Sequence, residues 1–307
     1  MLQVARLAPK LLGDSTPLVT AFLRSQQNPD GGFKDRAGNS DLYYTVFALE
    51  GLLALRASSP SPGTPGEGRG EGFFREPEPA GIADYLHSFA DGANLDFVHL
   101  SCLARCYAAL PKDHRPNPAI TDAILSHVER YRTPDGAYDA TPNAKSGSLY
   151  GCFLALGAYE DLGRPLPDPD ALIRCAQSLR TPDGGYANDP GLPLGLTPTT
   201  AAAATLLRHL GAPVPPEVPP WLFARFHPQG GFFATPDAPI PDLLSTATAL
   251  HALSGLHADL EPIKEPCLDF LDTLWTNKGA FYGTWEDDTP DAEYTYYALL
   301  SLGHLSL

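Results

Sequence analysis

The chain has 307 residues, of which 43% are hydrophobic and 19% are charged, as is typical of a globular protein and not of a disordered one. The formal net charge of −15 argues against nucleic acid as a partner, because so negative a surface repels phosphate groups. The 5 cysteines, an odd number without a Cys-x-x-Cys pair, argue against both a disulfide framework and a zinc ribbon.

The first residues bear on where the protein is found. Residues 1–6 lack the charged start, the long apolar stretch and the cleavage site of a secretory signal. No apolar run reaches the length of about 18 residues that a transmembrane helix requires. We therefore expect a cytoplasmic protein without transmembrane anchoring.

A turn phrase of the type Pro-Asp-Gly-Gly-aromatic recurs along the chain. Proline fixes φ in such a turn, aspartate accepts hydrogen bonds from nearby N–H groups, and glycine adopts positive φ. Nearly even spacing of the copies indicates a structural repeat. The copies occupy residues 29–33, 134–138, 182–186, 228–232 and 277–281, with a degenerate copy at 89–93.

Each turn phrase stands between two stretches with helical spacing. The first stretches are short and amphipathic, and they predict helices at 15–27, 82–89, 119–132, 168–179, 220–226 and 266–274. The second stretches are apolar on nearly all sides, which is typical of helices buried on both faces. They predict helices at 40–55, 95–110, 146–161, 198–210, 242–256 and 291–305.

Six such helical hairpins, each of about 50 residues, can close into a ring whose second helices line a central cavity. We therefore predict an all-α fold, an α/α toroid of six helical-hairpin repeats, forming a single domain over residues 1–307. A Pro/Gly-rich stretch at about 58–79 is expected to be a loop insertion between the first two units. The alternative is an open helical solenoid, but such arrays lack the turn phrase.

The segments 25–33 and 175–186, each leading to an inner helix, resemble the repeat of prenyltransferases and squalene cyclases. The resemblance covers nearly the whole chain, and the length is similar to that of a protein prenyltransferase β subunit of the geranylgeranyl type. It implies an isoprenoid or other lipid-like small molecule in the central cavity. It also implies a helical-repeat protein partner, or a homodimer formed through the same face.

The resemblance also implies positions for a zinc site. In that family, zinc is held by an aspartate, a cysteine two residues later and a histidine on the next inner helix, and it activates a thiol. Here Asp242 matches the aspartate, but Leu244 replaces the cysteine and Tyr294 replaces the histidine. The preceding loop, 233–240, has no Lys or Arg for a diphosphate. We therefore expect no zinc, no other cofactor and no standard prenyl transfer.

Class II cyclases of the same family protonate their substrate with an Asp-x-Asp-Asp motif. The corresponding segment, 242–245, keeps only its first aspartate, so the usual proton donor is missing.

Carboxylates and one histidine near the starts of the inner helices are the candidate catalytic groups. Aspartate at such a position also caps the helix by accepting hydrogen bonds from free N–H groups. Gathered at one mouth of a ring, these carboxylates could instead bind Mg²⁺. The candidates are Asp41, His99, Asp242 and Asp291.

Aromatic side chains on the inner helices suit an isoprenoid chain or a carbocation. The expected ligand contacts are Tyr43, Tyr44, Tyr107, Tyr150, Leu244, Tyr294 and Tyr296. Three hypotheses follow. The protein is an isoprenoid-binding toroid without zinc chemistry, or an unorthodox prenyltransferase or terpenoid enzyme that uses Mg²⁺ and the acidic mouth, or an interaction scaffold whose axis is filled by side chains.

Overall fold

The structure is a computed structural model that describes residues 1–56 and 79–307. The loop insertion expected at about 58–79 lies, apart from its last residue, outside the described residues. None of the described helices is both long enough and apolar enough to cross a membrane.

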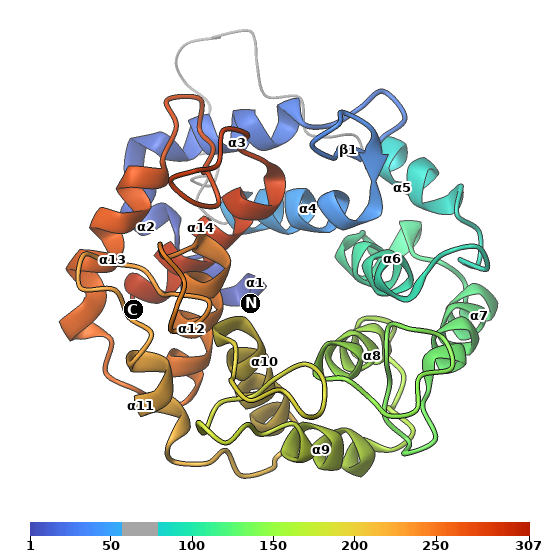
Figure 1. Ribbon diagram of the computed structural model, residues 1–307. Helices are drawn as coiled ribbons and strands as arrows, with labels where there is room; N and C mark the ends of the chain where they lie inside the picture. The colour runs from blue at the N-terminus through green and yellow to red at the C-terminus, as the bar shows by residue number, and fades with distance from the viewer. Residues whose placement is uncertain (57–78) are drawn as a thin grey trace, which may run out of the picture.

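Six inner helices form a closed ring (Figure 1). Each helix packs against the next one along the chain, and the last packs against the first, so the predicted toroid is confirmed and the open solenoid is excluded. Their observed bounds differ from the expected ones by less than one helical turn. The inner helices are α4 (Leu42–Arg56), α6 (Phe97–Ala109), α8 (Leu149–Asp161), α10 (Thr197–His209), α12 (Leu243–Gly255) and α14 (Ala292–Leu305).

Six outer helices surround this ring (Figure 1). All six have proline in the first two positions, where its missing N–H group has no intrahelical partner to lose. The outer helices are α3 (Thr16–Ser25), α5 (Pro79–His87), α7 (Pro118–Val128), α9 (Pro169–Ser178), α11 (Val218–Phe223) and α13 (Glu261–Leu274).

The last outer helix starts earlier than the sequence predicted. We expected it to begin at Pro266, because proline favours a first turn, but it begins at Glu261 and contains Pro266 in its interior. Pro262 takes the first-turn position instead. Two prolines close together left the start of the helix ambiguous in the sequence.

Short elements complete the chain. Strands β1 (Phe33–Lys34) and β2 (Ser40–Asp41) pair antiparallel, with Phe33 opposite Asp41. Within residues 1–56 and 79–307, single turns of 3₁₀ helix occur at Gly13–Ser15, Lys112–His114 and Glu129–Tyr131.

An N-terminal segment that the sequence analysis did not assign closes one end of the ring. It contains α1 (Leu2–Ala5) and α2 (Pro9–Leu12), and α1 packs against α14 and α4 (Figure 1). The approach is close, because a Cβ atom at Gly303 of α14 would lie 2.2 Å from the backbone oxygen of Val4. The absence of a side chain at Gly303 therefore allows α1 to pack closely against α14 at this end of the ring.

The turn phrases work as the sequence predicts. In the first, Asp30 accepts a hydrogen bond from the N–H group of Gly32 at 3.0 Å, and Gly31 has a φ of 94°. Equivalent glycines in the other phrases also have positive φ. The aromatic residues that end the phrases pack into the core with exposures of 0–3%, and they are Phe33, Tyr138, Tyr186, Phe232 and Phe281.

A threonine on the inner helix locks each of several turns to its helix. Thr246 accepts a hydrogen bond from the N–H group of Phe232 at 2.9 Å and donates to the carbonyl oxygen of Asp242 at 2.7 Å. Thr45 and Thr295 make the same two bonds in the first and last units. The turn is thereby held in register with the helix start.

Replacing this hydroxyl tests the lock. Thr246→Val keeps the shape of the side chain but leaves the buried Phe232 N–H group without an acceptor. We expect the free energy of unfolding to fall by about 1–3 kcal/mol in urea titrations. Thr248→Val is the matched control on the same helix, because that hydroxyl donates only to carbonyls of its own helix. Its expected effect is about 0.5 kcal/mol or less, and equal losses in both variants would contradict the lock.

Candidate functional site

A cavity of about 370 Å³ lies inside the ring, and all six inner helices contribute to its lining. Ligand sites of small molecules typically have volumes of about 300–1,000 Å³. We call the end where the inner helices begin the mouth, and the end that α1 covers the floor. At the mouth, Tyr150 both lines the cavity and is 42% exposed. The hypothesis of a scaffold with a filled axis does not agree with this hollow centre.

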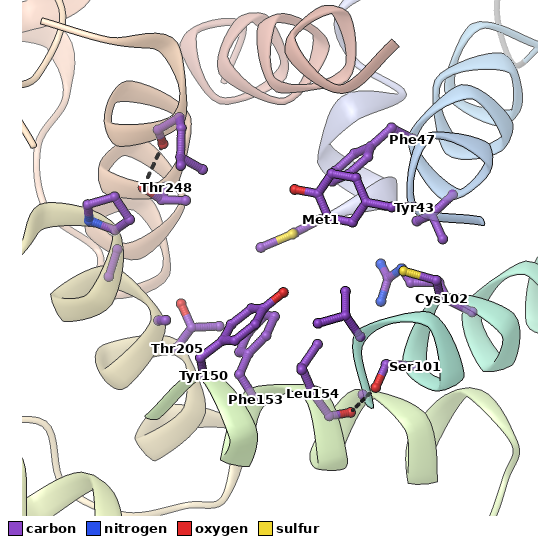
Figure 2. Close-up of a pocket in the computed structure, with 18 of the residues that line it drawn as sticks. Met1, Tyr43, Phe47, Ser101, Cys102, Tyr150, Phe153, Leu154, Thr205 and Thr248 are labelled. Carbon is purple, nitrogen blue, oxygen red and sulfur yellow. Dashed lines mark hydrogen bonds between the residues drawn. The ribbon is translucent and has the colours of Figure 1, made fainter. Parts of the chain in front are cut away.

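The wall of the cavity is mainly apolar. Figure 2 shows Tyr43 and Phe47 pointing inward from α4, and Tyr150 and Phe153 pointing inward from α8. The ring centroids of Tyr43 and Phe47 are 4.9 Å apart in an edge-on arrangement, and Phe47 also contacts Tyr297 of α14 at 5.4 Å. Smaller side chains leave the space in front of this aromatic wall, among them Gly157, Ala201, Ala202 and Thr205.

Four of the seven residues expected to contact a ligand line the cavity, namely Tyr43, Tyr150, Leu244 and Tyr296. Tyr44 and Tyr294 are outside the lining, near Arg36 at the mouth. The guanidinium carbon of Arg36 lies 5.5 Å from the centre of the Tyr294 ring.

Tyr107 points away from the cavity, contrary to the expectation. Its hydroxyl donates to the carbonyl oxygen of Leu86 in the outer helix α5, at 3.1 Å. The cavity face of α6 is set by Val98, Cys102 and Arg105. A residue two positions after Arg105 is turned by about 200° around a helix with 3.6 residues per turn, so Tyr107 faces the outer layer.

The aspartates at the mouth cap their helices. Each accepts a hydrogen bond from the N–H group three residues later, at distances of 2.7–3.3 Å, in Asp41, Asp96, Asp242 and Asp291. The second oxygen of Asp242 also accepts a hydrogen bond, from the hydroxyl of Ser245 at 2.7 Å. Burial raises the pKa of Asp242.

Asp41 and His99, from consecutive units, come together at the mouth. The imidazole Nε2 of His99 lies 3.3 Å from Asp41, and Nδ1 lies 2.8 Å from Asp96. The hydrogen bond with Asp41 raises the pKa of His99 to about 9, and the same bond lowers the pKa of Asp41. The three residues form a charged cluster that joins two units at the mouth.

Asp291 takes part in the seam between the first and last units. Arg36, from the loop between β1 and β2, donates to Asp291 and to Asp287 at 2.8 Å each. Burial raises the pKa of Asp291 although the guanidinium lies against it. Asp287 binds Arg36 through both oxygens.

Glu293 lies beside the cavity, bonded to one of the lining residues but outside the lining itself, and the sequence analysis missed it. It follows the cap Asp291 by two positions, and the residues in this register on other units, Tyr43, Tyr150 and Leu244, line the cavity. The hydroxyl of Tyr43 donates to the Glu293 carboxyl group at 2.6 Å across the α4–α14 seam. Burial raises the pKa of Glu293 to about 7. Alignment of the helix starts could have identified this residue, because its register is that of the family's cysteine ligand.

The family's zinc positions do not fit a metal. Leu244 contributes an alkyl group to the cavity wall, both oxygens of Asp242 are bonded to Ser245, and Tyr294 is a phenol. Throughout the part of the chain that the structure describes, no three His, Cys, Asp or Glu side chains are grouped as a metal site requires. Since zinc sites use at least three protein ligands, these residues do not provide one.

Comparison with known proteins places these features in a family. The sequence profile of the prenyltransferase alpha-alpha toroid domain matches residues 8–90, 93–225 and 201–306. No curated protein matches the sequence significantly.

Solved structures share the fold at low sequence identity. The type II terpene cyclase MstE from Scytonema, determined with its substrate geranylgeranyl dihydroxybenzoate, superimposes with a TM-score of 0.56 at 14% identity, over 97% of each chain. The Candida albicans protein geranylgeranyltransferase-I complexed with GGPP gives a TM-score of 0.47 at 16% identity, over 73% of this chain and 66% of that one.

Titration of the cluster around His99 gives a prediction. The pKa of His99 is about 9 in the folded chain, against about 6.5 in an unfolded one, so its ion pair stabilises the fold fully below about pH 6.5. The stabilisation is lost as the pH rises through about 9. Because the group is partly exposed, we expect His99→Gln to lower the free energy of unfolding by about 1–2 kcal/mol near pH 6.

Urea titrations of the wild type and of His99→Gln at several pH values measure this difference in the free energy of unfolding. The gap between the wild type and His99→Gln is expected to close above pH 9. A gap that stays constant with pH would show that the charge of His99 makes no contribution.

Proposed function

The chain belongs to the prenyltransferase alpha-alpha toroid family, and from this premise we propose that its cavity binds an isoprenoid or similar lipid-like small molecule. We further propose that it does so without zinc-dependent prenyl transfer. The observation that carries the proposal is an apolar, aromatic cavity of about 370 Å³ in the axis of a closed ring.

The lining favours a long hydrocarbon ligand. Aliphatic and aromatic side chains form most of the wall, and burying each methylene group of a ligand contributes about 0.8 kcal/mol. The faces of Tyr43, Phe47 and Tyr150 suit the double bonds of an isoprenoid chain. MstE, which shares the fold, acts on a geranylgeranyl compound, and this supports a chain of similar length here.

The charges at the mouth disfavour a diphosphate. Arg36 pairs with two carboxylates, and His99 lies between Asp41 and Asp96. Each cation is therefore surrounded by at least as much negative charge, and Glu293 lies nearby. Diphosphate recognition normally uses several uncompensated Arg or Lys side chains.

Filling the cavity tests the proposal. Ala202 lines the cavity on α10, and Ala202→Phe is expected to weaken binding of geranylgeraniol at least tenfold in a displacement assay with a fluorescent prenyl probe. Ala119→Phe, on the exposed side of the outer helix α7, is the matched control and should bind as the wild type does. Wild-type protein that binds no prenyl compound would refute the proposal.

Metal analysis tests the proposal that the protein does not carry out zinc-dependent prenyl transfer. The purified protein is expected to contain no stoichiometric zinc and to transfer no prenyl group from GGPP to a thiol. One zinc ion per chain, or transfer that a chelator abolishes, would show that other residues supply the missing ligands.

A second candidate function, acid-initiated cyclisation of an isoprenoid, has the Glu293 carboxyl group in its favour. With a pKa of about 7, Glu293 is largely protonated in mildly acidic solution. Its proton would add to a carbon–carbon double bond, whose electron pair forms the new C–H bond and leaves a carbocation. Tyr43 would stabilise the resulting Glu293 carboxylate through its hydroxyl, and the aromatic wall would stabilise the cation.

Product analysis separates this candidate from simple binding. Cyclised products from geranylgeraniol should form at about pH 6, decline as the pH rises through 7, and disappear in Glu293→Gln. We expect Tyr43→Phe to lower the rate about tenfold through loss of one hydrogen bond. Binding without any product in the wild type would leave only the first proposal.

Two further expectations concern magnesium and partners. The mouth carboxylates Asp41, Asp242 and Asp291 are each already hydrogen bonded or ion paired, which does not support Mg²⁺ binding. A helical-repeat partner, a homodimer and a cytoplasmic location stay predictions.

A further inference from the structure

Charged side chains form the floor of the apolar cavity. Nε of Arg105 donates to Glu50 at 2.6 Å, and its Nη1 atom lies 3.6 Å from Asp161. These three residues come from α4, α6 and α8, and all of them line the cavity. Charged groups are unfavourable in such a place unless their remaining hydrogen-bonding capacity is used.

Arg105 retains donors that the protein does not use. A guanidinium group carries five N–H donors, and Nη2 of Arg105 has no partner among residues 1–56 and 79–307. Its side chain is 35% exposed, whereas that of Glu50 is 8% exposed. The exposed surface of Arg105 belongs to the cavity, because the residue lies in the middle of α6 on the face that the ring encloses.

Tyr296 provides a second, independent observation. This residue lines the cavity, is 1% exposed, and its hydroxyl makes no hydrogen bond within the described residues. The hydroxyl lies near Glu50, without the geometry of a hydrogen bond. Buried hydroxyl groups in proteins nearly always have a partner, so this hydroxyl, beside Glu50, is a candidate contact for a polar ligand atom.

The charges on the floor select a neutral group. Two carboxyl groups surround one guanidinium, and burial raises the pKa of Asp161 to about 6. The α-ammonium group of Met1 also lies near Glu50 and Arg105, so charges of both signs meet at the floor, and an ionised ligand group would lose its hydration there without a net attraction to repay the loss. A hydroxyl group, in contrast, can accept from Arg105 and donate to a carboxylate at once.

From these observations we propose that the floor formed by Glu50, Arg105, Asp161 and Tyr296 binds the hydroxyl group of an isoprenoid alcohol. The alcohol lies with its hydroxyl group at the floor and its chain directed toward the mouth. The hydroxyl satisfies Nη2 of Arg105 and the free Tyr296 phenol. This inference rests on the proposed function, because it requires that the cavity bind an isoprenoid chain.

Matched ligands test the role of the hydroxyl group. The full chain is titrated with geranylgeraniol, with the corresponding hydrocarbon that lacks the hydroxyl, and with the corresponding carboxylic acid, each by displacement of a fluorescent prenyl probe. The alcohol is expected to bind at least tenfold more tightly than either of the other two.

Two variants test the residues. Tyr296→Phe should reduce the preference for alcohol over hydrocarbon at least threefold, and Glu50→Gln/Arg105→Gln/Asp161→Asn, which replaces Arg105 together with both of its carboxyl partners, should bring it close to 1. Tyr296→Phe should also leave the melting temperature of the free protein unchanged or higher, since it removes a hydroxyl without a partner. Tyr107→Phe is the control, because that hydroxyl is bonded outside the cavity, and it should keep the full preference.

The outcomes distinguish the two proposals. Equal binding of alcohol and hydrocarbon by the wild type, tighter binding of the acid, or an unchanged preference in both floor variants would overturn the inference and leave the proposed function standing. Failure of all three ligands to bind would overturn both.

Discussion

Packing of α14 against α4 is the contact on which the rest of the structure depends. It joins the last unit to the first and turns six stacked hairpins into a closed ring. Arg36 reinforces the seam at the mouth by binding Asp287 and Asp291 across it. Tyr43 and Glu293 share one hydrogen bond only because this seam exists.

At both ends of the cavity a cation lies between carboxyl groups, in a chain that is strongly negative as a whole. At the mouth, the cations Arg36 and His99 are each held between carboxylates. At the floor, Arg105 is held by Glu50 and Asp161. These pairs join neighbouring units, so the same interactions that neutralise the charges also fix how one hairpin sits against the next.

The same positions of this fold can carry different chemistry. Two residues after the helix cap, the family has a zinc-bound cysteine, whereas this chain has Leu244 in one unit and Glu293 in the next. Both residues are positioned by the same capping geometry, with an aspartate bonded to the N–H group three residues on. The scaffold therefore fixes where a side chain stands at the mouth, and the side chain decides whether that position binds a metal, packs against a ligand or holds a proton.

The sequence by itself determined the hairpins, their number and the capped helix starts, because turn phrases and caps act between residues only a few positions apart. Only the tertiary structure decided that Tyr107 faces outward, that Glu293 meets Tyr43, and that Arg105 stands between two carboxyl groups. These contacts depend on the rotation of each helix about its axis and on closure of the ring, which arise from packing between units and leave no local pattern in the chain.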